Sequence, residues 1–232
     1  KPMTVAAGLE EGVIGLNDTV NCTGIYKEIT PALRCWIYPG QHGPLDVVHG
    51  IQNSCNVFFS EMGHRLSMDE NGNYSPELGI EKIRKYASLF GLDETSGIEI
   101  AEREPQMTTE KPEASSIGQG KNSYSNIQLS RYITAVANKG TVFKLSLLDK
   151  MTDSQGNLLK DFTPEVTGHV DIADSTWDAV HQGMRAVVTD GSVNKIFKDL
   201  EVEIAGKTGT AQESRTRGNH AFFISYGPYT NP

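Results

Sequence analysis

The amino-acid sequence predicts an α+β fold in which helices flank an antiparallel sheet. Two observations lead to this prediction: apolar residues recur at helical spacing in several separate stretches, and two strand-like runs follow one another near the C-terminal end. The 232 residues are 38% hydrophobic and 22% charged, as is typical of a globular protein, and they show no internal repeat or low-complexity tract. We therefore expect a single domain over residues 1–232.

Four segments carry the signals of amphipathic helices. The clearest begins at Pro76, directly after the capping residue Ser75, and ends at Gly91. Gly12 and Gly140 are expected to end two others, because glycine readily adopts the left-handed conformation that closes many helices. The four helices are expected over residues 3–11, 76–90, 129–139 and 174–189.

The strand signals lie in the last third of the chain. Residues 201–210 begin with glutamates alternating with Val202 and Ile204, and residues 221–226 form a second strand-like run. A turn expected at residues 217–219 would join the two runs into an antiparallel hairpin. A weaker turn signal at residues 154–157 predicts another hairpin.

The charge balance excludes several classes of partner. The formal net charge is −8, so no basic surface for nucleic acid or for an anionic membrane is expected. No apolar run reaches the length of about 18 residues that would cross a bilayer, and we expect no signal peptide at the start of these residues.

The chain has three cysteines, Cys22, Cys35 and Cys55. They form no CxxC pair, and the sequence contains neither HExxH nor a tight run of cysteines and histidines. We therefore expect no structural zinc, no other metal and no cofactor. Cys22 and Cys35 lie in a stretch rich in turn residues, which suits either a small disulfide loop in an oxidising compartment or two ordinary buried thiols.

Two short motifs could carry chemistry. Lys207-Thr208-Gly209-Thr210 combines a cation, two hydroxyls and a glycine, which together could bind a carboxylate and let a substrate backbone approach closely. The alternative is an ordinary surface strand that enters a turn.

The second motif is Ser54-Cys55-Asn56, of the form SxN. About one such triplet is expected by chance in a chain of this composition, and Ser192-Val193-Asn194 is another. The first opens an apolar run, whereas the second follows Asp190-Gly191. We therefore expect the second to form a helix-ending turn away from any site.

The order of the motifs is more informative than each motif alone. SxxK, then an SxN-type triplet, then KTG is the signature of β-lactamases and penicillin-binding proteins. With Lys1 as the SxxK lysine, the chain resembles the transpeptidase domain of class B penicillin-binding proteins from end to end. Further landmarks of the resemblance are Trp36, His42-Gly43, residues 97–100, residues 116–120, Gln128-Leu129 and residues 137–140.

The chain departs from the family pattern at both ends. The nucleophilic serine would lie three positions before Lys1, and the chain stops at Pro232, before the further strand and helix that such domains have. Asn126 stands where the family usually has proline. We therefore expect a fragment of the penicillin-binding transpeptidase fold that is truncated at both ends, and that as given is inactive and forms no penicilloyl adduct.

The resemblance implies acyl transfer from a D-Ala-D-Ala peptide, and it implies a role for each motif residue. Lys1 would act as the general base, in a neutral form favoured by burial near Lys207. Ser54 would relay a proton to the leaving nitrogen, and the Asn56 amide would hold the donor peptide backbone. If these roles are right, these residues should converge on one cleft with Lys207 and Thr208.

The KTG segment would bind the other end of the peptide. Lys207 and Thr208 would hold its terminal carboxylate, and Gly209 would allow the close approach of its backbone. Thr210 would offer its backbone N–H to an oxyanion hole. Strand alternation predicts Lys207 and Gly209 on one face.

The resemblance also implies partners and a compartment. The expected partners are peptidoglycan stem peptides, β-lactam antibiotics and cell-division or elongation proteins, at the extracytoplasmic face of the bacterial membrane, with the anchor outside this chain. A disulfide between Cys22 and Cys35 is permitted there, with Cys55 a free thiol packed under the site.

Two alternatives to a D,D-transpeptidase remain open: a D,D-carboxypeptidase and a non-catalytic β-lactam sensor. A β-lactamase is disfavoured, because the 153 positions from Ser54 to Lys207 exceed what compact β-lactamases use.

Overall fold

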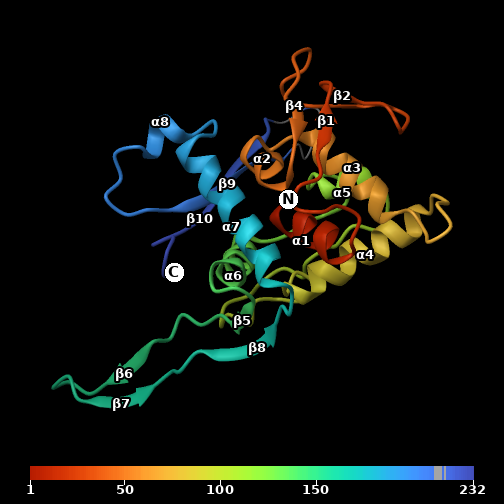
Figure 1. Ribbon diagram of the computed structural model, residues 1–232. Helices are drawn as coiled ribbons and strands as arrows, with labels where there is room; N and C mark the ends of the chain where they lie inside the picture. The colour runs from red at the N-terminus through yellow and green to blue at the C-terminus, as the bar shows by residue number, and fades with distance from the viewer. Residues whose placement is uncertain (212–215, 217) are drawn as a thin grey trace.

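The computed structural model describes residues 1–211, 216 and 218–232. Helices form the body of the molecule, and short strands lie around them (Figure 1). The helices are α1 (Pro2–Glu10), α2 (Val47–Gln52), α3 (Asn56–Leu66), α4 (Pro76–Leu89), α5 (Pro112–Ser116), α6 (Asn126–Ala137), α7 (Asp174–Thr189) and α8 (Asn194–Phe197). The strands are β1 (Val20–Cys22), β2 (Ile25–Tyr26), β3 (Leu33–Arg34), β4 (Gly43–Leu45), β5 (Thr141–Lys144), β6 (Lys150–Thr152), β7 (Leu158–Asp161), β8 (Glu165–His169), β9 (Ala205–Ala211) and β10 (His220–Tyr226).

The four predicted helices are confirmed as α1, α4, α6 and α7. Ser75 caps α4 as expected, since its hydroxyl accepts a hydrogen bond from the Leu78 N–H. The start of α6 is fixed by a capping box, in which Ser125 and Gln128 each accept a bond from the other's backbone. Local sequence signals were sufficient because α4, α6 and α7 each have one apolar face. The exception is α1, which is buried on all sides, since residues 4–8 are all buried.

The strands pair as five two-stranded antiparallel sheets in the part of the chain that the structure describes: β1–β4, β2–β3, β5–β8, β6–β7 and β9–β10. The predicted C-terminal hairpin is confirmed, with Lys207 opposite Ile224 and Gly209 opposite Phe222. The weaker hairpin is confirmed as β6–β7, where Thr152 pairs with Leu158. The combination of packed helices and antiparallel pairs is the expected α+β class.

The strand expected from residue 201 is wrong in its first four residues. Regular pairing begins only at Ala205, and Val202 is 53% exposed. The segment is held instead by Arg185 of α7, which donates to the Ile204 carbonyl at 2.7 Å and pairs with Glu203. Residues 201–204 therefore alternate in sequence like a strand, but no described strand pairs with them. Of the predicted turn at 217–219, residue 217 lies outside the described residues.

The core brings distant segments together around α7. This helix contacts α1, α2 and β9, and its residues Trp177, Val180 and Met184 are buried. Gly183 lets α7 approach α2 closely, because a Cβ there would meet the Ile51 side chain at 2.8 Å. One buried cluster therefore links the first helix of the chain to the C-terminal hairpin.

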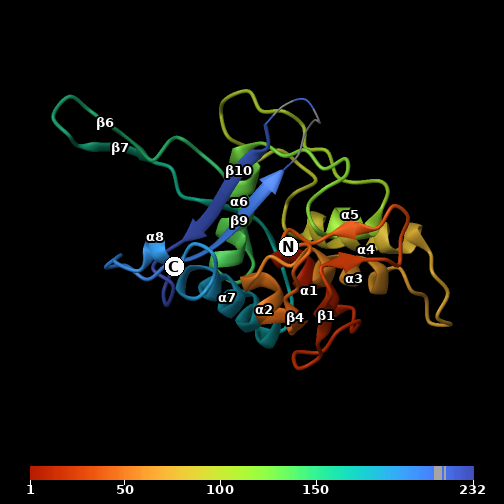
Figure 2. The ribbon, with the colours of Figure 1, turned by 90° about the horizontal axis from the view of Figure 1, so that it is seen from above.

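The β6–β7 hairpin projects away from this body (Figures 1 and 2). No helix in the described part of the chain is both long enough and apolar enough to span a bilayer.

Candidate active site

The centre of the candidate site is the side chain of Lys1. Its Nζ donates to the Ser54 carbonyl at 2.8 Å, to Ser54 Oγ at 3.0 Å and to Asn56 Oδ1 at 2.9 Å. An ammonium group has three donors, so this set of acceptors satisfies all of them. The Nζ also lies 5.2 Å from the centroid of the Phe59 ring. Lys1 is therefore held by segments more than fifty positions away in the sequence.

The turn that carries Ser54 lies between α2 and α3. Its shape is set by backbone bonds, since the Ser54 N–H donates to the Ile51 carbonyl and the Cys55 N–H to the Gly50 carbonyl. Ser54 adopts a left-handed conformation with φ of 49°, which costs a residue with a Cβ roughly 1 kcal/mol or more. Backbone strain of this kind is typical of functional sites. Asn56 is oriented from behind, because its Nδ2 donates to the Arg34 carbonyl at 3.2 Å.

Lys207 lies on β9 in a different setting. Its side chain is 5% exposed, and among the described residues its Nζ donates to the Thr208 carbonyl at 2.8 Å and to Thr208 Oγ1 at 3.5 Å, both within its own strand. Exposure rises along the strand, so that Gly209 and Thr210 lie at the surface. The end of β9 is thus open to an approaching ligand.

Burial makes both lysines easy to deprotonate. It lowers the pKa of Lys1 to about 8, against the opposing effect of negative charge on Cys55 and Cys35. It lowers the pKa of Lys207 to about 7, and the positive charge of Lys1 adds to that decrease. The two ammonium groups therefore influence each other, and a neutral amine is accessible near physiological pH.

The structure thus brings Lys1, Ser54 and Asn56 into direct contact and couples Lys207 to them electrostatically. Thr208, Gly209 and Thr210 follow Lys207 along β9. The other SxN triplet differs. Ser192 and Val193 form the turn after α7, and Asn194 begins α8, which lies apart from the N-terminus in both views (Figures 1 and 2).

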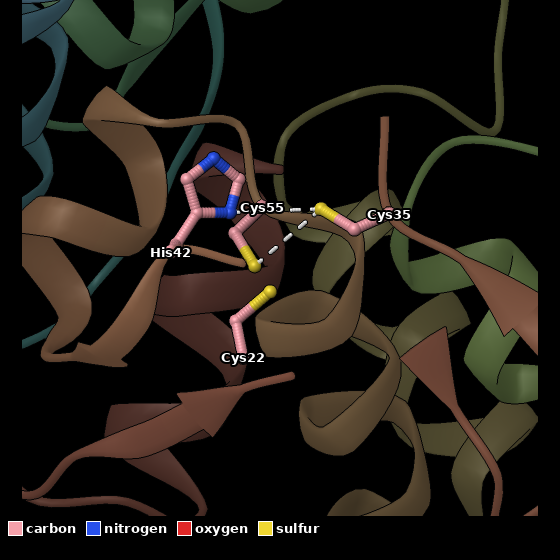
Figure 3. Close-up of side chains that lie close together, drawn as sticks. All are labelled: Cys22, Cys35, His42 and Cys55. Carbon is pink, nitrogen blue, oxygen red and sulfur yellow. Dashed lines mark hydrogen bonds between the residues drawn. The ribbon is translucent and has the colours of Figure 1, made fainter. Parts of the chain in front are cut away.

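All three cysteines are buried free thiols. Of the two possibilities left open for Cys22 and Cys35, the structure therefore shows buried thiols and no disulfide, and Cys55 is free as expected. The sequence has no tight run of cysteines and histidines, but the fold brings such side chains together. Cys22, Cys35, Cys55 and His42 point toward one another, with their potential ligand atoms all within 4.8 Å of each other (Figure 3).

Sequence reasoning missed this cluster because it looked for ligands a few residues apart. The available signal was a pair of histidines, His42 and His49, between the second and third cysteines. They lie in a stretch of 34 residues from Cys22 to Cys55 that holds every cysteine of the chain. What joins these positions is the β1–β4 pairing, which sets Cys22 opposite Gly43, the neighbour of His42.

Comparison with protein families agrees with this geometry. The model of the penicillin binding protein transpeptidase domain matches residues 1–232, so the chain belongs to that family.

Among curated proteins, the chain is 26% identical to penicillin-binding protein 2A of Bacillus subtilis and 26% identical to the peptidoglycan D,D-transpeptidase MrdA of Escherichia coli. Each alignment covers 100% of this chain, but only 35% and 40% of the respective relative.

Among solved structures, penicillin-binding protein 2 of Pseudomonas aeruginosa, in complex with WCK 5153, superposes with a TM-score of 0.80 at 26% identity. That match covers 100% of this chain and 52% of the other. The chain therefore spans well under two thirds of the proteins it matches.

Proposed function

We propose that this chain belongs to a D,D-transpeptidase of peptidoglycan synthesis, which cross-links stem peptides by serine acyl transfer. The observation that carries the proposal is the triple contact of Lys1 Nζ with Ser54 and Asn56, close enough to Lys207 for the two charges to interact. This arrangement supports a site to which all three motifs of the family contribute. The match of residues 1–232 to the transpeptidase domain supports the same reaction.

In the proposed reaction, a serine three positions before Lys1 attacks the penultimate carbonyl of a D-Ala-D-Ala peptide. Neutral Lys1 accepts the serine proton, because serine is a weak nucleophile without an adjacent base. The tetrahedral intermediate collapses, the C–N bond breaks, and the terminal D-Ala leaves with a proton passed through Ser54. An acceptor amine then attacks the acyl-enzyme, forms the new amide bond and releases the serine.

The second lysine has a different task in this proposal. Lys207 and Thr208 bind the carboxylate of the terminal D-Ala, which supplies a charge partner to a buried ammonium that forms no ion pair within the described residues. The backbone N–H of Thr210 donates to the developing oxyanion. Gly209 contributes by having no side chain, so the peptide can run alongside β9. β-Lactams would bind the same groups through their own carboxylate.

We further propose that the protein works at the extracytoplasmic face of the membrane, where stem peptides are cross-linked. A solved structure that matches this fold is described as the complex of a Helicobacter pylori penicillin-binding protein with MreC, at 19% identity. By analogy of fold, cell-division or elongation proteins are proposed as partners.

The test uses a polypeptide that contains residues 1–232 with a serine three positions before Lys1, called here the serine-bearing chain. Incubation with a penicillin and measurement of intact mass should give one adduct on that serine. Residues 1–232 alone should give none, and an adduct on Ser54 would contradict the roles assigned here.

Turnover separates the remaining candidates. A transpeptidase deacylates very slowly with penicillin and transfers a donor peptide to an added amine. Release to water alone would instead indicate a D,D-carboxypeptidase, and acylation with no peptide turnover would indicate a sensor.

A further inference from the structure

The cluster of three thiols and one imidazole has no role in the reaction proposed above. Cys22 ends β1, Cys35 follows β3, and Cys55 caps the N-terminus of α3. His42 directly precedes β4. Four separate backbone segments therefore deliver one side chain each to the same buried point (Figure 3).

We propose that Cys22, Cys35, His42 and Cys55 form a tetrahedral binding site for a divalent transition metal, with zinc as the preferred ion. Cys₃His is one of the ligand sets of structural zinc sites. Soft thiolate ligands in a four-coordinate arrangement favour zinc over magnesium or calcium, which bind through oxygen.

The distances agree with this assignment. In a tetrahedron with Zn–S bonds of about 2.3 Å, two sulfur atoms lie about 3.8 Å apart, and a nitrogen bound at about 2.1 Å lies about 3.6 Å from each sulfur. Cys35 Sγ and Cys55 Sγ are 3.8 Å apart, and Cys35 Sγ and His42 Nδ1 are 3.6 Å apart. These two spacings match two edges of a zinc tetrahedron, and all the potential ligand atoms lie within 4.8 Å of one another. A disulfide would need the sulfurs about 2.0 Å apart.

The surroundings are those of a structural site. All three cysteines are at most 3% exposed, and the Phe58 N–H donates to Cys55 Sγ at 3.4 Å, which suits a thiolate. The nearby strand pairs β1–β4 and β2–β3 are only two or three residues long, which is too short for stable pairing without other support. A bound metal would supply that support, because it would link the ends of β1, β3 and β4 to α3.

The site lies next to the catalytic turn, because Cys55 is the middle residue of Ser54-Cys55-Asn56. A metal on its sulfur would fix the position of the strained Ser54 and of Asn56, both of which bind Lys1. This second half of the inference rests on the proposed function, whereas metal binding itself does not.

The first experiment measures metal directly. The reduced chain is incubated with zinc sulfate, passed through a desalting column and analysed by mass spectrometry for metals. One zinc per chain is expected. Less than 0.1 zinc per chain would overturn the proposal, and so would a disulfide found between any two of the three cysteines under these conditions. Cobalt substitution should give the intense visible bands of a tetrahedral, thiolate-rich site.

Variants then test the ligands. His42→Ala should lower zinc affinity at least 100-fold, whereas His42→Cys should keep one zinc and shift the cobalt spectrum toward four thiolates. His49→Ala is the matched control, since His49 lies exposed on α2 and its side chain pairs with Asp46. Equal zinc affinity in His42→Ala and His49→Ala would overturn the ligand assignment.

Coupling to the catalytic turn is tested on the serine-bearing chain. Removing zinc with a chelator should slow penicillin acylation at least tenfold, and zinc but not magnesium should restore it. Acylation unchanged by metal removal would overturn the coupling alone. A chain that binds zinc but is never acylated would instead overturn the proposed function and leave the metal site standing.

Discussion

The two halves of the candidate active site hold their lysines in opposite ways. In the first half-site (Lys1, Ser54 and Asn56), the lysine donates three hydrogen bonds, all to acceptors more than fifty positions away in the sequence. In the second half-site (Lys207 to Thr210), the lysine bonds to its own neighbour Thr208 and to nothing else in the described part of the chain. The first is a closed network among residues of the chain, whereas the second is a bond within one strand at an exposed strand end. This difference fits the proposed roles, in which Lys1 is the general base and Lys207 binds the carboxylate of the substrate.

The largest expected effect comes from breaking the closed network. Lys1→Met should slow penicillin acylation of the serine-bearing chain by about 10³, because general bases contribute about 10²–10⁴ in rate. Lys85→Met is the control, since Lys85 forms a surface ion pair with Glu11. Acylation is followed with a fluorescent penicillin, and circular dichroism checks the fold. A Lys1→Met rate within threefold of the parent would remove Lys1 from the mechanism.

A smaller effect is expected from the open half-site. Lys207→Met should lower the second-order rate constant of acylation by about 10- to 150-fold, the equivalent of a charged hydrogen bond of about 1.5–3 kcal/mol. A penicillin methyl ester provides the matched ligand, because it lacks the carboxylate. The parent chain should prefer the free acid strongly and Lys207→Met hardly at all. Equal preference in the two proteins would mean that Lys207 does not bind the carboxylate.

The pH dependence should report both half-sites together. The productive form needs neutral Lys1, whose pKa is about 8, and protonated Lys207, whose pKa is about 7. Because the two groups interact, a plot of the second-order rate constant of acylation against pH should be bell-shaped, with its maximum near pH 7.5. The rate rises about tenfold per unit below pH 7 and falls about tenfold per unit above pH 8. Lys207→Arg keeps its charge, so it should lose the alkaline limb. An alkaline limb that persists in this variant would assign it to another group.

The smallest effects should come from one glycine in each region. A Cβ on Gly50 would lie 2.7 Å from the buried Phe58 ring, so Gly50→Ala should lower the free energy of unfolding by about 1–2 kcal/mol. A Cβ on Gly209 would lie 3.5 Å from Phe222, an ordinary contact, so Gly209→Ala should change that free energy by less than about 0.5 kcal/mol. Gly209→Ala should nevertheless slow acylation severalfold. Urea titration measures the stability of both variants, and the acylation assay measures their rates. A destabilised Gly209→Ala together with an unchanged stability of Gly50→Ala would contradict this prediction.

The sequence was a sufficient guide wherever structure is local. Ser75 and Pro76 mark the start of α4 by themselves. The paired strand around Lys207 could also be expected, although its burial decreases toward Gly209 and Thr210 instead of alternating. Local context favours Ser54, which opens an apolar run, over Ser192, which follows Asp190-Gly191, and this choice stays a prediction. For the helices and the hairpin, the deciding interactions lie within a few residues or repeat with a regular period.

The sequence was a poor guide wherever structure depends on a distant partner. Val202 and Ile204 alternate like a strand, but the described chain gives them no strand to pair with. The approach of His42 to Cys22 depends on a sheet of three-residue strands, which are too short to leave a periodic signal. The three bonds of Lys1 likewise follow from the packing of α1 against α3, which no local pattern encodes.

The closed half-site has a consequence for how the protein is made. Lys1, the Ser54 turn and the thiol cluster all lie within the first 56 residues, so they can assemble soon after that segment leaves the ribosome. Lys207 follows Asn56 by about 150 residues. At about 5–20 residues per second, the growing chain carries half of its site for about 8–30 s before the other half exists. During synthesis, Lys1 can therefore reach its three acceptors before the strand that carries Lys207 has been made.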